Sequence, residues 1–386
     1  MPPWSIMSQA PARRSASALP ATPAGRVRDT LDAAEEAFAA NTKRAIRADT
    51  DDFIRWCIAQ KRESLPAGPE TVVAYLDDLA ARTNPRTAKP LAVATLARRL
   101  ASLAWLHRVH GHPDPTKAAP VQLKMKALAR RKGTRQTQAL GLGRAELDLI
   151  FAAIGDGPLL EDLRDAALLA VGYDALLRRS ELVTLRVEDI KIEADGSGLL
   201  YLARSKTDQD GQGHYGWLAP DTVHRLRAWT EARADALRAE TKRLRKELSG
   251  LAAALREGRV VNGARRRQAL ERALARLDGA ADALWLQVGQ GGAVLGPLAV
   301  RGPDPGRRVS EIFKRRAEAA GLDPALVSGH SLRVGAAQDL TAAGFGLPAI
   351  QQAGRWKSPS MPARYAEKIV PRQGAMAQLA GKQGRR

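Results

Sequence analysis

The chain has 386 residues, enough for two domains with separate cores, and 45% of its side chains are hydrophobic. Its 61 lysines and arginines exceed its 41 acidic residues and give a formal charge of +20. The single cysteine, Cys57, excludes a disulfide framework, and no apolar run is long enough to span a bilayer. We therefore expect a cytoplasmic protein with no membrane segment. Nucleic acid is its expected partner, and a basic ribosome-associated protein is the alternative on charge alone.

Residues 1–36 are rich in Ala, Pro, Ser and Arg, which predicts a disordered tail. Residues 37–132 carry apolar side chains at helical spacing, which predicts a small all-α DNA-binding domain with basic flanks. Exposed charges on helices often serve solubility alone, so the prediction of DNA contact depends on the second domain. The residues expected to contact DNA here are Lys43, Arg44, Arg98, Arg99, Arg130, Arg131 and Lys132.

A Gly- and Thr-containing stretch over residues 133–143 predicts a linker, and a second domain follows over 144–386. That domain is predicted to be mainly helical, with a small β-hairpin near 198–218 around a polar, Gly-rich turn. The predicted fold class is thus mainly α, with an N-terminal helical domain and a mixed, mostly α, second domain.

Leucines repeat at intervals of seven from Leu237 to Leu251, and the helical period resumes at Leu270 after a Gly-containing break. This pattern predicts an antiparallel two-helix hairpin over about 230–282, with an arginine-rich outer face. DNA, a partner protein or nothing at all could bind that face. We favour DNA or an accessory partner.

Four separated patches of the second domain carry side chains suited to phosphate chemistry. Arg178 lies among leucines, where an unpaired charge is costly, and either pairs with Glu181 or points toward a phosphate. Lys206 lies in the turn of the predicted hairpin, where a lysine alone is usually only solvated. His330 and Arg333 share one face at the start of a helix, although a histidine that caps a helix is an equal alternative.

The fourth patch holds Trp356 and Tyr365, either of which alone would be read as a core residue. Together the patches provide a phenol nucleophile, two always-charged arginines for the non-bridging oxygens, and an acid for the leaving oxygen. No cluster of acidic residues suggests a two-metal nuclease, and no phosphate-binding glycine loop is present. We therefore expect neither a metal nor a cofactor.

The order Arg178, Lys206, His330–Arg333, Trp356, Tyr365 closely resembles the tyrosine site-specific recombinase, or phage integrase, family. The flanking segments "SGHSLRVGAAQDL" and "AGRWKSPSMPARY" match it as well. The resemblance implies that Tyr365 is the nucleophile, Lys206 the general acid and Glu181 the supporting acidic residue. His330 would serve as acid or base, and Trp356 would donate a hydrogen bond.

The same resemblance implies cleavage through a 3′-phosphotyrosyl link and strand exchange through a Holliday junction. A homotetramer would hold two DNA sites, and the free chain would be a weak monomer or dimer. Residues 371–386 would contact a neighbouring protomer, and Arg307 and Arg308 would begin a helix that reads the major groove. The enzyme would be bacterial or phage-encoded and act on the nucleoid.

Two other functions compete with this interpretation. A type IB topoisomerase-like enzyme would use the same chemistry to relax DNA as a monomer. A DNA-binding architectural protein would bind without cutting, although the complete set of catalytic side chains speaks against it. The helical hairpin insertion has no counterpart in the recognised pattern and leaves both target sequence and assembly open.

Overall fold

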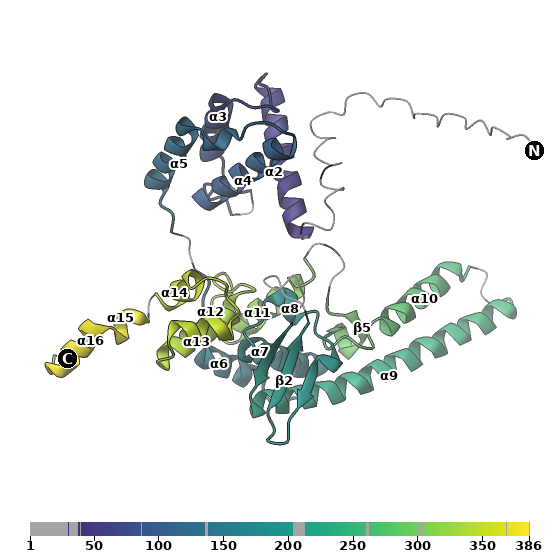
Figure 1. Ribbon diagram of the computed structural model, residues 1–386. Coiled ribbons are helices and arrows are strands. Elements are labelled where there is room, and N and C mark those ends of the chain that lie inside the picture. The colour runs from purple at the N-terminus through teal and green to yellow at the C-terminus, as the bar shows by residue number, and fades with distance from the viewer. Residues whose placement is uncertain are drawn as a thin grey trace, which may run out of the picture. The chain divides into compact units, whose positions relative to one another are not determined.

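The computed structural model describes residues 30, 38, 40–85, 87–135, 138–203, 213–259, 262–299, 302, 304–367 and 369–385. The chain divides between residues 137 and 138 into two compact units, each with its own hydrophobic core. Helices dominate and the sheets are small and antiparallel, which confirms the predicted fold class (Figure 1). Apart from Thr30, the predicted tail over 1–36 lies outside the described residues.

The first unit is a small helical bundle. Its aromatic core joins Phe53 and Tyr75, whose ring centroids lie 5.0 Å apart in an edge-to-face arrangement. Cys57 is fully buried in this core, and burial raises the pKa of its thiol to about 12, so it packs as an apolar residue. The helices are α2 (Ala40–Ala59), α3 (Pro69–Ala81), α4 (Val93–Val109) and α5 (Ala119–Lys132), with a 3₁₀ turn at Pro115–Lys117.

The second unit is built around α7 (Leu160–Asp174), whose residues from Arg164 to Gly172 are all buried. A helix that is apolar on nearly every side must be covered by its neighbours, and α9 and α12 pack against it. The other helices are α6 (Arg144–Ile154), α8 (Arg179–Leu182), α9 (Pro220–Arg256), α10 (Ala264–Asp278), α11 (Arg307–Ala319), α12 (Ser331–Ala342), α13 (Leu347–Ala353), α14 (Ser360–Ala366), α15 (Val370–Gln373) and α16 (Ala375–Lys382).

Two small antiparallel sheets accompany these helices. The first has the order β1 (Ile190–Ile192), β2 (Gly198–Leu202), β3 (His214–Leu218), and its last two strands form the predicted hairpin. Residues 204–212, which lie between β2 and β3 in the sequence, are outside the described part of the chain. The second sheet pairs β4 (Leu286–Val288) with β5 (Val294–Pro297).

Two stacked tryptophans connect α9 to the end of α8. The ring centroids of Trp229 and Trp285 lie 6.4 Å apart, and both residues are fully buried. The indole nitrogen of Trp229 donates to the Leu284 carbonyl at 2.9 Å, and that of Trp285 donates to the Leu182 carbonyl at 2.8 Å. Buried indole N–H groups need such acceptors. The bond from Trp285 thus holds the backbone at the last residue of α8.

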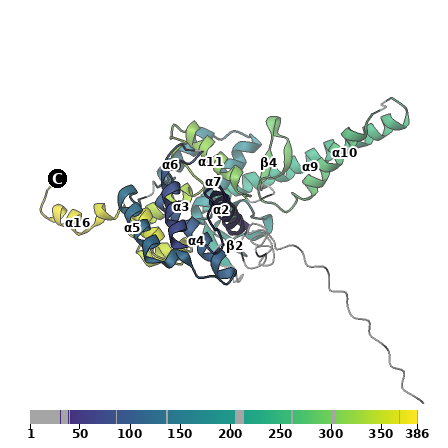
Figure 2. The ribbon, with the colours of Figure 1, turned by 90° about the horizontal axis from the view of Figure 1, so that it is seen from above.

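Helix α9 continues for 37 residues and returns as α10, forming a hairpin that projects from the rest of the second unit (Figures 1 and 2). The two helices share a seam of buried leucines: Leu244, Leu251, Leu270 and Leu277. These residues lie at the spacings from which the sequence predicted the hairpin.

The end of the predicted linker belongs to the second unit. The amide of Leu140 donates to the Leu326 carbonyl and that of Leu142 to the Ser331 carbonyl, both at 2.9 Å. Leu142 is fully buried against α12. A side chain at Gly335 would lie 2.2 Å from the Leu142 carbonyl carbon, so only glycine permits this close approach.

No helix within the described ranges is long and apolar enough to cross a membrane.

Candidate active site

Arg178 and Glu181 form an ion pair at the start of α8. The chain enters this helix through Leu176, whose φ is +45°, a left-handed conformation that is uncommon for leucine. The Arg178 amide donates to Glu181 Oε2 at 2.9 Å, and its Nη1 donates to Oε1 at 2.5 Å. The side chain of Glu181 is 5% exposed and that of Arg178 is 15% exposed. Arg178 therefore pairs with Glu181, one of the two predicted interpretations. This pair leaves the other guanidinium nitrogens unused, so it does not exclude the second interpretation, contact with a phosphate.

Arg333 projects from α12 into the same region and is 2% exposed. Its Nη1 donates to the Leu176 carbonyl, and its Nη2 donates to the Gly354 carbonyl at 2.7 Å. The guanidinium carbon lies 4.6 Å from the ring centroid of Trp356, which is cation–π distance. The segment before α14 and the loop before α8 therefore meet at this one arginine.

Trp356 lies between Arg333 and Tyr365. The Trp356 and Tyr365 rings meet edge to face, with centroids 5.8 Å apart. Tyr365, on α14, is 9% exposed and packs against α12. A side chain on Gly354 would lie 1.8 Å from the Trp356 ring, so this position has to be glycine.

Arg355 is a site residue that the sequence analysis missed. Its Nη2 donates to Glu181 Oε2 at 2.9 Å, and its side chain is 7% exposed. Its two terminal nitrogens also reach the carbonyls of Ala175 and Leu176, each at 3.3 Å. In the sequence it is one more arginine beside a tryptophan, and no spacing rule connects it to a carboxylate 174 positions away.

The site holds more positive than negative charge. Arg178, Arg333 and Arg355 surround one carboxylate, that of Glu181. Burial lowers the pKa of Arg333 to about 9, with repulsion from Arg178 and Arg355 acting in the same direction. Burial alone would raise the pKa of Glu181, but Arg355 and Arg178 outweigh it, so that pKa is lowered. An anion placed here would relieve the repulsion among the three arginines.

Tyr365 has its phenol in this electropositive surrounding. Burial raises the pKa of Tyr365 above its usual value, and Arg333, Arg364 and Arg178 oppose that effect. The phenol is therefore neutral at physiological pH and would have to give up its proton in any attack on phosphorus. The arginines would stabilise the oxygen as that proton leaves.

Two further residues, His330 and Lys206, are predicted to be catalytic. His330 is the N-cap of α12, one turn before Arg333, and it is exposed. Lys206 lies outside the described residues.

Several of the predicted DNA-contact residues have intramolecular partners. Arg98 pairs with Asp49, and Arg99 pairs with Asp52 and with the Tyr75 hydroxyl. Arg44 donates to Asn41, and Lys132 donates to the Ala80 and Leu91 carbonyls. Arg307 donates to Glu311. Lys43 is half-buried, Arg130 and Arg131 are exposed, and Arg308 is half-buried at the start of α11. These residues therefore remain predicted contacts.

Known proteins match this architecture and this chain. A model of the phage integrase family matches residues 142–370, which include all the active-site residues described above. Recombinase Cre of Escherichia phage P1 is 28% identical over 354 residues, covering 89% of each chain. The integrase/recombinase XerD homologue of Selenomonas ruminantium is 35% identical over 184 residues, 46% of this chain and 50% of that one. The Tn1549 transposon integrase, solved with circular intermediate DNA, has the same fold, with a TM-score of 0.52 at 12% identity over 90% of this chain and 95% of that one.

The fold and the family match together define the class of this protein, an enzyme that breaks and rejoins DNA strands. The chain belongs to the phage integrase family, the tyrosine site-specific recombinases, which confirms the family and the kind of enzyme predicted from the sequence.

Proposed function

We propose that this chain recombines DNA at specific sites through a 3′-phosphotyrosyl intermediate and a Holliday junction, without ATP or a metal. The observation that carries the proposal is a group of three buried or half-buried arginines with a single glutamate, in which the Trp356 ring contacts both Arg333 and Tyr365. Such a site is complementary to a phosphorane, which gains a second negative charge as the nucleophile attacks.

In the proposed first step the Tyr365 oxygen attacks the scissile phosphorus. The bond from phosphorus to the Tyr365 oxygen forms, the bond to the 5′ oxygen breaks, and the 3′ phosphate stays on the protein. The phenol proton passes to His330, which acts as the base and returns it when the phenol leaves in the second step, while Arg178 and Arg333 neutralise the non-bridging oxygens and Trp356 adds a hydrogen bond. In the second step a 5′ hydroxyl from another strand displaces the tyrosine, so bond energy is conserved and no nucleotide is consumed.

Lys206 is proposed as the acid that protonates the 5′ leaving oxygen. Replacing Lys206 by Ala is expected to slow cleavage about 100-fold on ordinary DNA, the usual scale for general acid catalysis. A bridging sulfur at the 5′ position leaves without protonation, so cleavage of that substrate by the variant should return close to the wild-type rate. The measurement is single-turnover covalent-complex formation on both substrates. No rescue by sulfur would contradict the role.

Four protomers are proposed to assemble on two double-stranded DNA sites. Helix α16 extends from the second unit and buries none of its residues, with Met376 68% and Leu379 42% exposed (Figure 2). An apolar face without a partner on a short C-terminal helix fits a docking site on a neighbouring protomer. The basic residues predicted to contact DNA, in the first unit and at Arg307 and Arg308, would bind the phosphates of the duplex. The enzyme would act on the DNA of the nucleoid.

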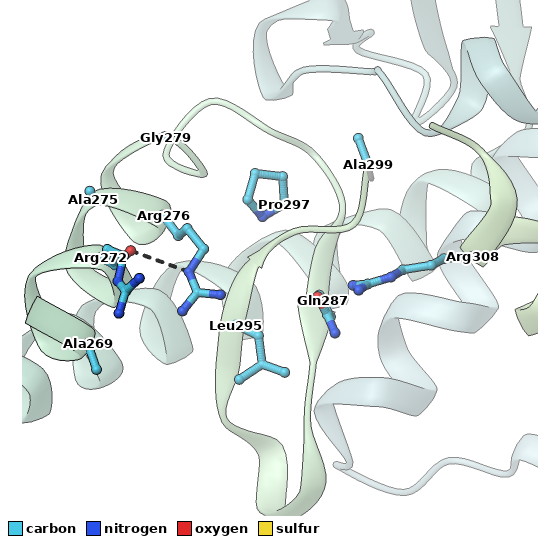
Figure 3. A pocket seen from close by; sticks show the side chains of 10 residues that line it. All are labelled: Ala269, Arg272, Ala275, Arg276, Gly279, Gln287, Leu295, Pro297, Ala299 and Arg308. Carbon is cyan, nitrogen blue, oxygen red and sulfur yellow. Dashed lines mark hydrogen bonds between the residues drawn. The ribbon is translucent and has the colours of Figure 1, made fainter. Parts of the chain in front are cut away.

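The helical hairpin is proposed to receive an accessory partner with an acidic surface. Between α10, the β4–β5 sheet and α11 lies a groove of about 710 Å³ (Figure 3). Arg272, Arg276 and Arg308 line it, and among the described residues none of the three pairs with a carboxylate. Replacing Arg272 and Arg276 by Glu should abolish partner-dependent stimulation of recombination with DNA affinity unchanged. Unchanged stimulation would contradict this assignment.

Strand exchange between two duplexes tests the proposed function against its alternatives. The duplexes carry the sequence that the protein protects in footprinting of DNA beside its own gene, and each has a different end label. Site-specific recombination predicts four-way junctions and products that carry both labels, with EDTA present. Relaxation of supercoiled plasmid without exchange would favour the topoisomerase-like alternative, and protection without cleavage would favour an architectural protein.

A further inference from the structure

Arg355 occupies a backbone conformation that an arginine seldom adopts. Its φ is +54°, in the left-handed region that favours glycine, and yet its side chain is 7% exposed. Such conformations persist only where the surroundings hold them, and they gather at functional sites. The contacts of the guanidinium therefore have to explain why an arginine is present.

The guanidinium connects the segment that carries Trp356 to the loop that carries the first catalytic arginine. It donates to the Ala175 and Leu176 carbonyls and to Glu181 Oε2. The Leu176 carbonyl also accepts from Arg333, so two arginines from different segments share one oxygen. That oxygen belongs to the other left-handed residue of the site, Leu176, whose φ is +45°.

The decisive feature is how the two oxygens of Glu181 are divided. Oε1 accepts from Nη1 of Arg178, whereas Oε2 accepts from the Arg178 amide and from Arg355. An arginine facing a free carboxylate tends to bind both oxygens through two parallel bonds. Because Arg355 occupies Oε2, the Arg178 guanidinium is held through one nitrogen only. Its other donors stay available for a phosphate.

Fold stability alone does not account for this side chain. Its Nε atom is buried and finds no acceptor within the described part of the chain. Arg355 also adds a third positive charge to a buried site with one carboxylate, which lowers the pKa of Arg333 further. A buried donor without a partner and repulsion between like charges both destabilise a fold.

We propose that Arg355 is a positioning residue for strand cleavage. By taking one oxygen of Glu181, it keeps the Arg178 guanidinium from closing on that carboxylate and leaves it directed to the scissile phosphate. The inference rests on the proposed recombinase function and extends it to a residue that does not itself touch DNA.

The test replaces Arg355 by Gly, which adopts φ +54° without strain and removes the whole side chain, the guanidinium included. The rate of covalent-complex formation at saturating DNA is expected to fall about 30-fold, within the range of coupling in one hydrogen-bond network. The DNA dissociation constant should stay within about twofold, because Arg355 is inside the protein. A wild-type cleavage rate in this variant would overturn the proposal.

A double-mutant cycle separates positioning through Arg178 from an independent structural role. In an Arg178→Ala background, Arg355→Gly should slow cleavage by less than about threefold, because the residue it positions is gone. A further loss of about 30-fold in that background would show that Arg355 acts independently and would overturn the assignment.

A second variant, Arg355→Lys, covers the case in which the Gly variant melts below the assay temperature. Lysine keeps the charge but lacks the planar fork that reaches two carbonyls and a carboxylate, so about a 10-fold loss of rate is expected. Full activity would contradict the proposal.

Wild-type protein in the same gel tests the proposed function itself. Without a wild-type covalent band, the proposed function is wrong, and so is the role of Arg355.

Discussion

Replacing Tyr365 by Phe is expected to abolish the covalent protein–DNA complex while leaving the fold and the DNA affinity intact. The ring stays packed on Trp356, at 5.8 Å between centroids, and only the attacking oxygen is lost. Loss of a covalent nucleophile lowers turnover by at least about 10⁴-fold. The measurement is a denaturing gel of labelled duplex after incubation with each protein.

The matched control is Tyr215→Phe. Tyr215 lies on β3, is 65% exposed, and loses one hydroxyl in the same way. Both variants should melt within a few degrees of wild type, because neither change removes buried apolar area. A covalent band of normal intensity from the Tyr365 variant, or its loss from the Tyr215 variant, would show that Tyr365 is not the nucleophile.

The second large effect is expected at Arg178. Arg178→Ala should remove about 3 kcal/mol or more of transition-state stabilisation, the scale measured for a donor to a developing oxyanion. The free DNA duplex does not carry that extra charge, so the dissociation constant should change far less than the cleavage rate. Single-turnover cleavage and a binding titration at the same salt concentration separate the two quantities.

The structure also predicts that this variant stays folded. Removing one partner of a buried ion pair is usually destabilising, because a charge is left unpaired. Here Glu181 keeps Arg355 at 2.9 Å, so thermal unfolding should shift by only a few degrees. The control is Arg186→Ala, an exposed arginine, eight positions along, whose guanidinium pairs with Glu188. Equal loss of cleavage and of DNA affinity in the Arg178 variant would contradict a transition-state role.

The sequence predicted most of the residues that lie together at the candidate site, because phosphodiester chemistry restricts the residue types. A phenol, arginines and a helix-start histidine in one order are a rare combination, although each alone is commonplace. The β2–β3 hairpin was predictable because Gly-rich residues separate two alternating runs. The helical seam of α9 and α10 was visible in the leucine spacing.

Other features had no local signal. Arg355 joins the site only because its backbone turns left-handed and meets Glu181, 174 positions away. The β4–β5 pair has strands of only three and four residues, too short for an alternating pattern to stand out in the sequence. Residues 140–142 have the composition of a linker, yet their amides pair with carbonyls beside α12, a long-range contact that no window of sequence contains.

The unbroken course of α9 has a mechanical consequence. At about 1.5 Å per residue, its 37 residues make a rod of roughly 55 Å. The inner end of this rod carries Trp229, whose stacked neighbour Trp285 holds the Leu182 carbonyl, next to Glu181. We therefore expect a force on the far end of the rod to reach Leu182, the neighbour of the carboxylate that two arginines share.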